Sequence, residues 1–245
     1  TLVTYDWVPE FPRTLVRDLR VRWVLEELEQ PYNIETVPLN PKSDAHCAIQ
    51  PFGQVPVIRD GDRSVFESGA ILIHLGEGSA LMPDAQRAEV IQWMFAALNT
   101  LEMVSGSWMQ MVLAQKFPDF FGPAPEDEVI AYARQAMNHK LRVMQEVLDG
   151  RNWLVGDFSI ADIAMSDVLR AVEGLGALAD WPGLSDYVAR AKARPAFQKA
   201  MNDQMAHWQA ADEERRQRDA GQRARQSAFW PRAAGVRPAR HGDQR

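Results

Sequence analysis

The sequence predicts two domains of different class, an α/β domain at the N-terminus and an all-helical domain after it. Over the first ~75 residues, short strand-type segments alternate with segments of helical period, an order typical of α/β domains. From residue 86 to residue 211 the apolar pattern is helical throughout. A length of 245 residues with 46% apolar content allows two domains with buried cores. We expect these domains over residues 1–77 and 86–211, joined by a linker over residues 78–85.

The first domain is predicted to begin with a strand at Leu2–Tyr5. Apolar residues at three- and four-residue spacing predict a helix over residues 15–28. It ends before Pro31, because the residue preceding a proline avoids the helical conformation. Asp60 and Gly61 suit a tight hairpin turn. The other expected elements are strands at 34–37, 55–58 and 64–66 and helices at 41–50 and 70–75.

The helical domain contains two long predicted helices, over residues 90–101 and 129–148. Ser159 and Asp162 fit a capping box at the start of another helix, in which the serine accepts from the Asp162 N–H and the carboxylate reaches back. The first long helix carries more apolar surface than one core needs, which favours a homodimer. Its apolar residues are Met94, Phe95, Leu98 and Leu101.

Charge is distributed unevenly along the chain. The net charge is −6, but residues 212–245 carry nine arginines and five acidic residues, a balance of +4 that leaves −10 on the rest. An acidic body argues against nucleic acid as a partner. The Arg-rich tail has few aliphatic side chains, so we expect it to be flexible.

The use of cysteine and the absence of long apolar runs limit the class of protein. A single cysteine, Cys47, excludes an internal disulfide and any Cys-x-x-Cys redox or zinc motif, and we expect it to be a small buried residue. The five histidines show no metal-ligand spacing, so no metal is expected. No N-terminal stretch resembles a signal peptide, and no apolar run could span a bilayer. We therefore expect a cytoplasmic protein without a membrane partner.

Four landmarks resemble the glutathione transferase superfamily. They are a Val-Pro step within residues 51–58, the Glu67-Ser68 pair, the pattern of residues 20–28 and the capping box described above. They occur in the order and spacing of that family. The resemblance implies a thioredoxin-like N-terminal domain, an all-α helical-bundle domain after it, glutathione as ligand and co-substrate, and a homodimer.

By this resemblance, the bond between Val55 and Pro56 is cis, and the Val55 N–H and C=O pair with the cysteinyl backbone of glutathione, as a sheet edge pairs with a peptide. Without the resemblance, Pro56 would indicate an edge strand. The resemblance also places Gln54 and Lys42 beside the tripeptide, with Lys42 toward its glycyl carboxylate. The alternative for Lys42 is an ordinary exposed lysine near a helix start.

Glu67 and Ser68 directly precede an apolar helix. The free N–H groups and the positive dipole end of a helix start favour an anion, and the resemblance assigns this place to the γ-glutamyl carboxylate. The alternative is that Ser68 is a plain N-cap. The two roles are compatible, because a ligand can share the cap.

The group that stabilises the glutathione thiolate departs from the family pattern. The family usually supplies one tyrosine or serine hydroxyl, but Leu15 stands where the serine is expected. Three candidates remain, ranked Thr14, Tyr5 and Arg17. Arg17 would act by charge, although it also belongs to a pattern typical of a solvated helix face. That pattern consists of Arg17, Arg20, Arg22 and Glu26.

The resemblance also implies an electrophile pocket beside the fourth helix, where we expect Trp108, Met109 and Met111. The expected function is a glutathione transferase of the detoxification type, which adds the thiolate to a small hydrophobic electrophile. The alternative is a non-catalytic binding or regulatory protein of the same fold, similar to a stress factor, which the missing serine favours. A thiol oxidoreductase is not expected, because no cysteine lies near the first helix.

Overall fold

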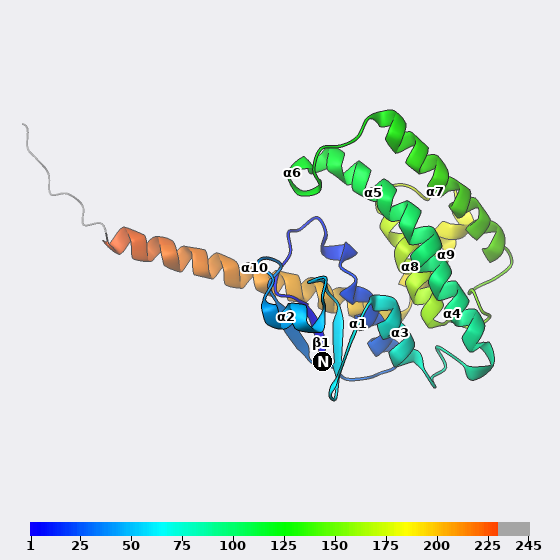
Figure 1. Cartoon of the computed structure of the whole chain (residues 1–245), viewed down its shortest axis with the longest axis horizontal. Coiled ribbons are helices and arrows are strands. Elements are labelled where there is room, and N and C mark those ends of the chain that lie inside the picture. Colours follow the sequence, from blue (N-terminus) through cyan, green and yellow to red (C-terminus); the bar gives the residue numbers. More distant parts are fainter. Residues whose placement is uncertain (230–245) are drawn as a thin grey trace, which may run out of the picture. The chain divides into compact units, whose positions relative to one another are not determined.

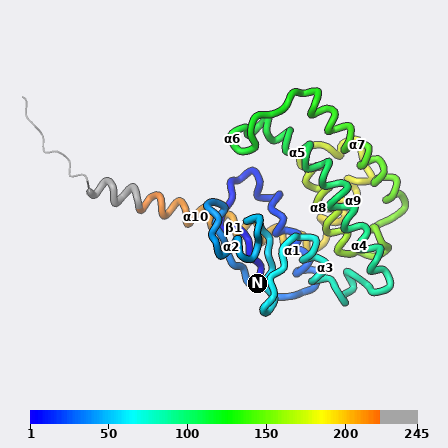
Figure 2. The backbone as a smooth tube through the Cα atoms, viewed as in Figure 1, coloured from blue at the N-terminus to red at the C-terminus, as the bar shows by residue number. Residues whose placement is uncertain are grey.

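The computed structural model describes residues 1–229, with the side chains of residues 1–221. The chain divides at Gln209 into two compact units. The unit of residues 1–208 contains a small sheet with its covering helices, followed by a bundle of helices (Figures 1 and 2). The predicted fold class, an α/β thioredoxin-like part followed by an all-α part, is therefore confirmed.

The sheet has the strand order β2-β1-β3-β4. Its strands are β1 (Leu2–Tyr5), β2 (Ile34–Val37), β3 (Val57–Asp60) and β4 (Arg63–Phe66). β1 runs parallel to β2 and antiparallel to β3, and β3 pairs with β4 as a hairpin. The hairpin turn contains Gly61 at φ +56°, a left-handed conformation that favours glycine.

Helices cover both faces of the sheet. They are α1 (Asp18–Glu27), α2 (Asp44–Ile49) and α3 (Ser68–Gly76). Because successive side chains of a strand face opposite sides, Leu2 and Val3 enter different cores. Leu2 packs with residues of α1 and α3, whereas Val3 packs in the cluster that includes Ile49 of α2.

Helix α1 begins later than the sequence predicts, and more of it is buried. The helix predicted over residues 15–28 begins at Asp18, because Val16 is extended (φ −69°, ψ 124°). The prediction of a solvated arginine face is wrong for Arg20 and Arg22, which are each 2% exposed. Arg22 pairs with Asp18 at 2.8 Å and Arg20 pairs with two carboxylates described below, and these partners allow the two guanidinium groups to be buried.

Helix α2 is shorter than predicted. It begins at Asp44, where the Ser43 side chain accepts a hydrogen bond from the His46 N–H and caps the helix. Cys47 lies on the outer side of this helix and is exposed, so the prediction that it is buried is wrong. A short helix on a sheet buries only one side, and His46 occupies that side here.

Helix α8 is the central element of the helical bundle. The bundle helices are α4 (Arg87–Phe95), α5 (Glu102–Lys116), α6 (Pro118–Phe121), α7 (Asp127–Leu148), α8 (Ile160–Glu173) and α9 (Pro182–Lys192). A π-helical turn, Ala96–Leu101, joins α4 to α5. Residues 160–169 of α8 are all buried, and α8 packs against α1, α3, α4, α5 and α9. It therefore links the two parts of the fold.

The predicted capping box at the start of α8 is present. The Ser159 N–H donates to Asp162 Oδ2 at 3.0 Å, and the Ser159 hydroxyl donates to the same oxygen at 2.9 Å. The other oxygen, Oδ1, accepts from the Leu154 N–H at 3.0 Å and from the Tyr187 hydroxyl at 2.8 Å. The box thus ties α8 to the preceding loop and to α9.

The last helix, α10 (Pro195–Phe229), continues into the segment for which a flexible tail is expected. Arginine, glutamate, glutamine and alanine are strong helix formers, so the composition that suggested irregular structure also supports a helix. Residues 230–245 of the expected tail lie outside the described residues.

Within residues 1–229, no helix combines the length and the apolar character that a membrane span requires.

Candidate functional site

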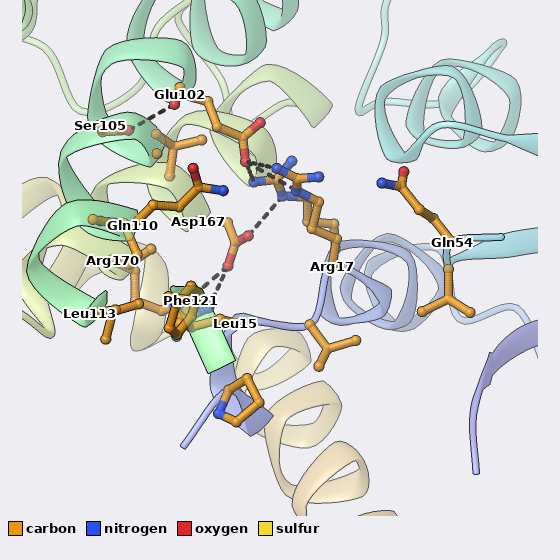
Figure 3. Close-up of a pocket in the computed structure, with 18 of the residues that line it drawn as sticks. Leu15, Arg17, Gln54, Glu102, Ser105, Gln110, Leu113, Phe121, Asp167 and Arg170 are labelled. Atoms are coloured by element: carbon orange, nitrogen blue, oxygen red, sulfur yellow. Dashed lines mark hydrogen bonds and ion pairs between the residues drawn. The ribbon is translucent and has the colours of Figure 1, made fainter. Parts of the chain in front are cut away.

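A cavity of about 370 Å³, here called the first cavity, lies between the sheet domain and the helical bundle (Figure 3). One wall comes from the end of β1, the segment before α1 and the residues before β3. The opposite wall comes from α5, α6 and α8. The first wall includes Tyr5, Leu15, Val16, Arg17, Gln54 and Val55, and the second includes Glu102, Met109, Leu113, Phe121, Asp167 and Arg170.

The sheet-domain wall contains two of the predicted glutathione-binding residues. Gln54 and Val55 line the cavity, and the Val55–Pro56 bond is cis, as predicted. Lys42 is not a lining residue, but its Nζ donates to the lining Tyr5 hydroxyl at 3.1 Å. The Lys42 ammonium also lies 4.3 Å from the centre of the Tyr5 ring.

A cluster of ion pairs joins the two walls of the cavity (Figure 3). Arg20 donates from Nε to Asp167 at 2.7 Å and from Nη2 to Glu102 at 2.7 Å. Arg170 donates to the other oxygen of Asp167 at 2.7 Å, and Arg17 Nη2 lies 3.1 Å from Glu102. The cluster therefore connects α1 and the segment before it to α5 and α8.

Burial and charge oppose each other within this cluster. Burial favours the neutral form of Arg20, but the carboxylates of Asp167 and Glu102 outweigh it and raise the Arg20 pKa. Burial likewise favours the neutral form of Asp167, but Arg170 and Arg20 lower its pKa below the ordinary value. Both groups therefore stay charged at neutral pH.

A second cavity, of about 640 Å³, lies at the start of α3. Glu67 and Ser68 line it, and it shares Arg17, Glu102 and two further α5 residues with the first cavity. Ser68 is buried, and its Oγ accepts from Arg20 Nη1 at 3.3 Å. Glu67 has φ +68°, a conformation that costs about 1–3 kcal/mol for a residue other than glycine and that tends to occur at functional sites.

The three candidates for the thiolate-stabilising group are placed differently. Tyr5 and Arg17 line the first cavity, whereas Thr14 is exposed and is not among the lining residues. Thr14 lies in a 3₁₀ turn, Arg13–Leu15, and its carbonyl accepts from Arg170 at 2.5 Å. The residue that faces the cavity at this point is Leu15.

The three residues predicted to line the electrophile pocket also differ in their positions. Met109 lines the first cavity, but Trp108 is buried in the core, with the Arg134 guanidinium 4.8 Å from its ring, and Met111 is not a lining residue. The α5 residues that share a face with Met109 are one helical turn away, and of these Ser105 and Leu113 line the cavity. The i, i+4 spacing from Met109 would have identified them.

Two aromatic side chains of the cavity come from outside the predicted helices. Phe120 and Phe121 belong to the short helix α6 and pack edge-on against Phe11, at ring distances of 5.0 and 5.6 Å. Phe11 also stacks on Phe117 at 4.5 Å. Helix α6 has only four residues, which is too short for a periodic apolar pattern to mark it as a helix in the sequence.

Among the described residues there is no group of acidic, histidine or cysteine side chains that could hold a metal.

Known proteins resemble both parts of the chain. Residues 12–77 match the family model of the glutathione S-transferase N-terminal domain, and residues 107–195 match that of the C-terminal domain. The probable glutathione S-transferase GSTF2 of Oryza sativa subsp. japonica is 30% identical over 190 residues, which are 72% of this chain and 86% of the relative. Glutathione S-transferase F10 of Arabidopsis thaliana is 32% identical over 144 residues, 54% of this chain, and the match spans 64% of the relative's length.

Solved structures that resemble this chain belong to the same family as its sequence relatives. A glutathione transferase from Pseudomonas putida, solved with glutathione disulfide bound, has a TM-score of 0.67 and 26% sequence identity, over 82% of this chain and 89% of that chain. Both family models and both parts of the fold therefore point to one assignment. The chain belongs to the glutathione transferase superfamily.

Proposed function

We propose that this protein binds glutathione and adds its thiolate to a small apolar electrophile. The lining of the two cavities is the observation that supports this proposal. The first cavity combines Val55, beside a cis proline, with an apolar wall, and it shares residues with the second cavity, where Ser68 lies at a helix start. A tripeptide with a thiol at its centre and an anionic end fits such a site.

The proposed position of glutathione follows from the chemistry of each wall. Val55 precedes β3 and lies outside the pairing of β3 with β1 and β4, so its backbone N–H and C=O suit the cysteinyl segment. The γ-glutamyl carboxylate suits the start of α3, where Ser68 and the nearby Arg20 add to the positive end of the helix dipole. Gln54 then lies beside the tripeptide, and Lys42 lies toward its glycyl carboxylate.

The electrophile is proposed to occupy the apolar wall of the first cavity. Met109 and Leu113 of α5 and Phe121 of α6 line this wall. Apolar and aromatic side chains favour an apolar, flat ligand, because ring stacking adds to the burial of area. A panel of aromatic and alkyl electrophiles tests the proposal, and we expect the aromatic compounds to give the higher turnover.

A non-catalytic glutathione-binding protein is the second candidate. Leu15 and Val16 favour it, because aliphatic side chains line the cavity where the family pattern places a hydroxyl. The two functions differ in one measurement. Glutathione binding without turnover of any electrophile in the panel would support the second candidate.

The first prediction concerns Ser68. We expect Ser68→Ala to weaken glutathione binding by about tenfold to a hundredfold, because a hydroxyl contact to a carboxylate contributes about 1.5–3 kcal/mol. Isothermal titration calorimetry gives the affinity. Ser185→Ala is the matched control, because it removes a hydroxyl from the first turn of α9, away from both cavities. Equal affinity of the folded Ser68→Ala variant and the wild type would remove Ser68 from the site.

The second prediction is that the protein is a homodimer. Phe95 and Met103 are 54% and 64% exposed and both line the second cavity, and exposed apolar side chains that gather on one surface favour a contact between subunits. Met94 and Leu101, which are predicted from the sequence to belong to the same surface, are instead buried in the core of the subunit. Sedimentation at micromolar concentration is the test, and a monomer there would contradict the proposal.

A further inference from the structure

The charges around the first cavity do not balance. Among the described residues, three arginines and two carboxylates line this cavity. The arginines are Arg17, Arg20 and Arg170, and the carboxylates are Glu102 and Asp167. The wall therefore carries one positive charge in excess, which an anion in the cavity would neutralise.

The excess charge is concentrated on Arg17. Arg20 is 2% exposed and bonds to Asp167, Glu102 and Ser68. Arg170 bonds to Asp167 and to a backbone carbonyl. The Arg17 side chain is 51% exposed, and it shares a single oxygen, Glu102 Oε1, with Arg20. Arg17 is thus the most exposed of the three guanidinium groups.

Arg17 can leave Glu102 at little cost. An exposed ion pair contributes about 0–1 kcal/mol, and Glu102 keeps its 2.7 Å bond to buried Arg20 when Arg17 moves. Arg17 is the residue that precedes α1, and it lines the same cavity as Val55. Its guanidinium therefore has a resting partner that it can leave, and access to the space beside Val55.

The hydroxyl groups of the cavity differ in what they can donate. The Ser105 hydroxyl donates to the Glu102 carbonyl at 3.3 Å, whereas the Tyr5 oxygen accepts from Lys42 and keeps its own proton, so Tyr5 is the competing donor in the test below. Leu15 has no polar atom. We propose that the Arg17 guanidinium, in place of a hydroxyl, stabilises the thiolate of bound glutathione, with Glu102 as its resting partner. This inference rests on the proposed function.

The expected effect is a lowered thiol pKa. A cation within about 4–6 Å lowers the pKa of an acidic group by about 1–3 units, and a free thiol has a pKa near 8.5. The proton passes to solvent, and the sulfur keeps its electron pair and its negative charge. With a shift of about 2 units, bound glutathione is mostly thiolate at neutral pH.

The test compares Arg17→Met, which removes the charge, with Arg17→Lys, which keeps it. We expect Arg17→Met to raise the pKa of the bound thiol by about 1–2 units, measured by thiolate ultraviolet absorbance against pH. Turnover at about pH 6.5 should fall about tenfold to a hundredfold, and the difference should close at alkaline pH. Arg17→Lys should keep most of the pKa shift.

Arg87→Met is the matched control. Arg87 is 47% exposed and lies 3.1 Å from Glu77, close to the 51% exposure and 3.1 Å distance of Arg17, but it lines neither cavity. We expect its loss to leave the bound-thiol pKa unchanged. Binding of S-methylglutathione, which has no ionisable thiol, should stay within about twofold of wild type in Arg17→Met.

Three results would overturn the inference. An unchanged bound-thiol pKa in Arg17→Met, with a raised pKa in Tyr5→Phe or Thr14→Val, would assign the role to a hydroxyl. An equal loss of glutathione and S-methylglutathione binding in Arg17→Met would show that Arg17 binds a carboxylate. A wild-type protein that binds no glutathione would refute the proposed function itself, and this inference with it.

Discussion

Replacing Asp167 with asparagine is expected to lower the free energy of unfolding by about 3–5 kcal/mol. The Asp167 carboxylate is buried on α8 and bonds to Arg20 on α1 and to Arg170. Asparagine keeps the shape but leaves Arg20, which is itself buried, with one carboxylate instead of two. Denaturant unfolding at pH 7 measures the loss.

The loss of unfolding free energy in Asp167→Asn should decrease as the pH falls. Burial alone would raise the pKa of Asp167, but Arg170 and Arg20 hold it below the ordinary value. A group whose pKa is depressed in the folded state contributes stability above its unfolded pKa, about 3.9 for aspartate. That contribution disappears as the pH falls through the lower, folded-state pKa. The difference between wild type and Asp167→Asn should therefore shrink below about pH 4.

Glu173→Gln is the matched control for Asp167→Asn. Glu173 lies on the same helix and pairs with Lys192 at 3.0 Å, but both side chains are partly exposed. We expect a loss of at most about 1 kcal/mol. A similar loss in both variants would show that the buried cluster adds no special stability.

A second measurement links this cluster to the proposed role of Arg17. Asp167→Asn leaves three arginines facing one carboxylate at the first cavity. If the excess positive charge stabilises the thiolate, the pKa of bound glutathione should fall below the wild-type value while stability also falls. General damage to the site would raise that pKa instead, so the two explanations predict opposite signs.

The sequence contains most of the information about the fold, because short-range periodicity decides strands and helices. β1 and β2 have the predicted bounds, and α7 covers its predicted range. The first and last residues of the helices are less predictable, because they depend on single backbone angles. Val16 is extended and delays α1, which no pattern of apolar residues around it indicates.

The candidate site was predictable only where a local motif marks it. Val55 with Pro56 and Glu67 with Ser68 are adjacent pairs, so a resemblance can locate them. Arg20 could not be assigned in this way, because its partner Asp167 lies 147 residues further along the chain. On its own helix Arg20 matches a solvated face, and only the packing of α8 against α1 shows that it is buried.

The last prediction concerns Asp162, the carboxylate of the capping box. We expect Asp162→Ala to lower the free energy of unfolding by about 3–5 kcal/mol, more than the ~1 kcal/mol of a typical helix cap. The reason is the number of buried donors that it satisfies. The Leu154 N–H, the Ser159 N–H and hydroxyl, and the Tyr187 hydroxyl all donate to it. Thermal and denaturant unfolding measure the loss.

Two variants separate this effect from that of an ordinary helix start. Tyr187→Phe removes one of the four donors and should cost about 1 kcal/mol. Asp127→Ala removes an acidic residue from the first turn of α7, where it is exposed, and should cost at most about 1 kcal/mol. A loss in Asp162→Ala no larger than that in Asp127→Ala would contradict the structural role.

The pH dependence of the Asp162 effect should have the opposite sign to that of Asp167. Burial raises the pKa of Asp162 above the ordinary value, although its hydrogen-bond donors pull it down. A raised pKa gives a contribution that is present below the unfolded pKa and is lost as the pH rises through the folded one. The difference between wild type and Asp162→Ala should therefore be larger near pH ~4 than at pH ~7. Because Asp162 lines neither cavity, glutathione affinity of the folded variant should stay close to wild type, and lost binding with a normal Tm would assign Asp162 to the ligand site.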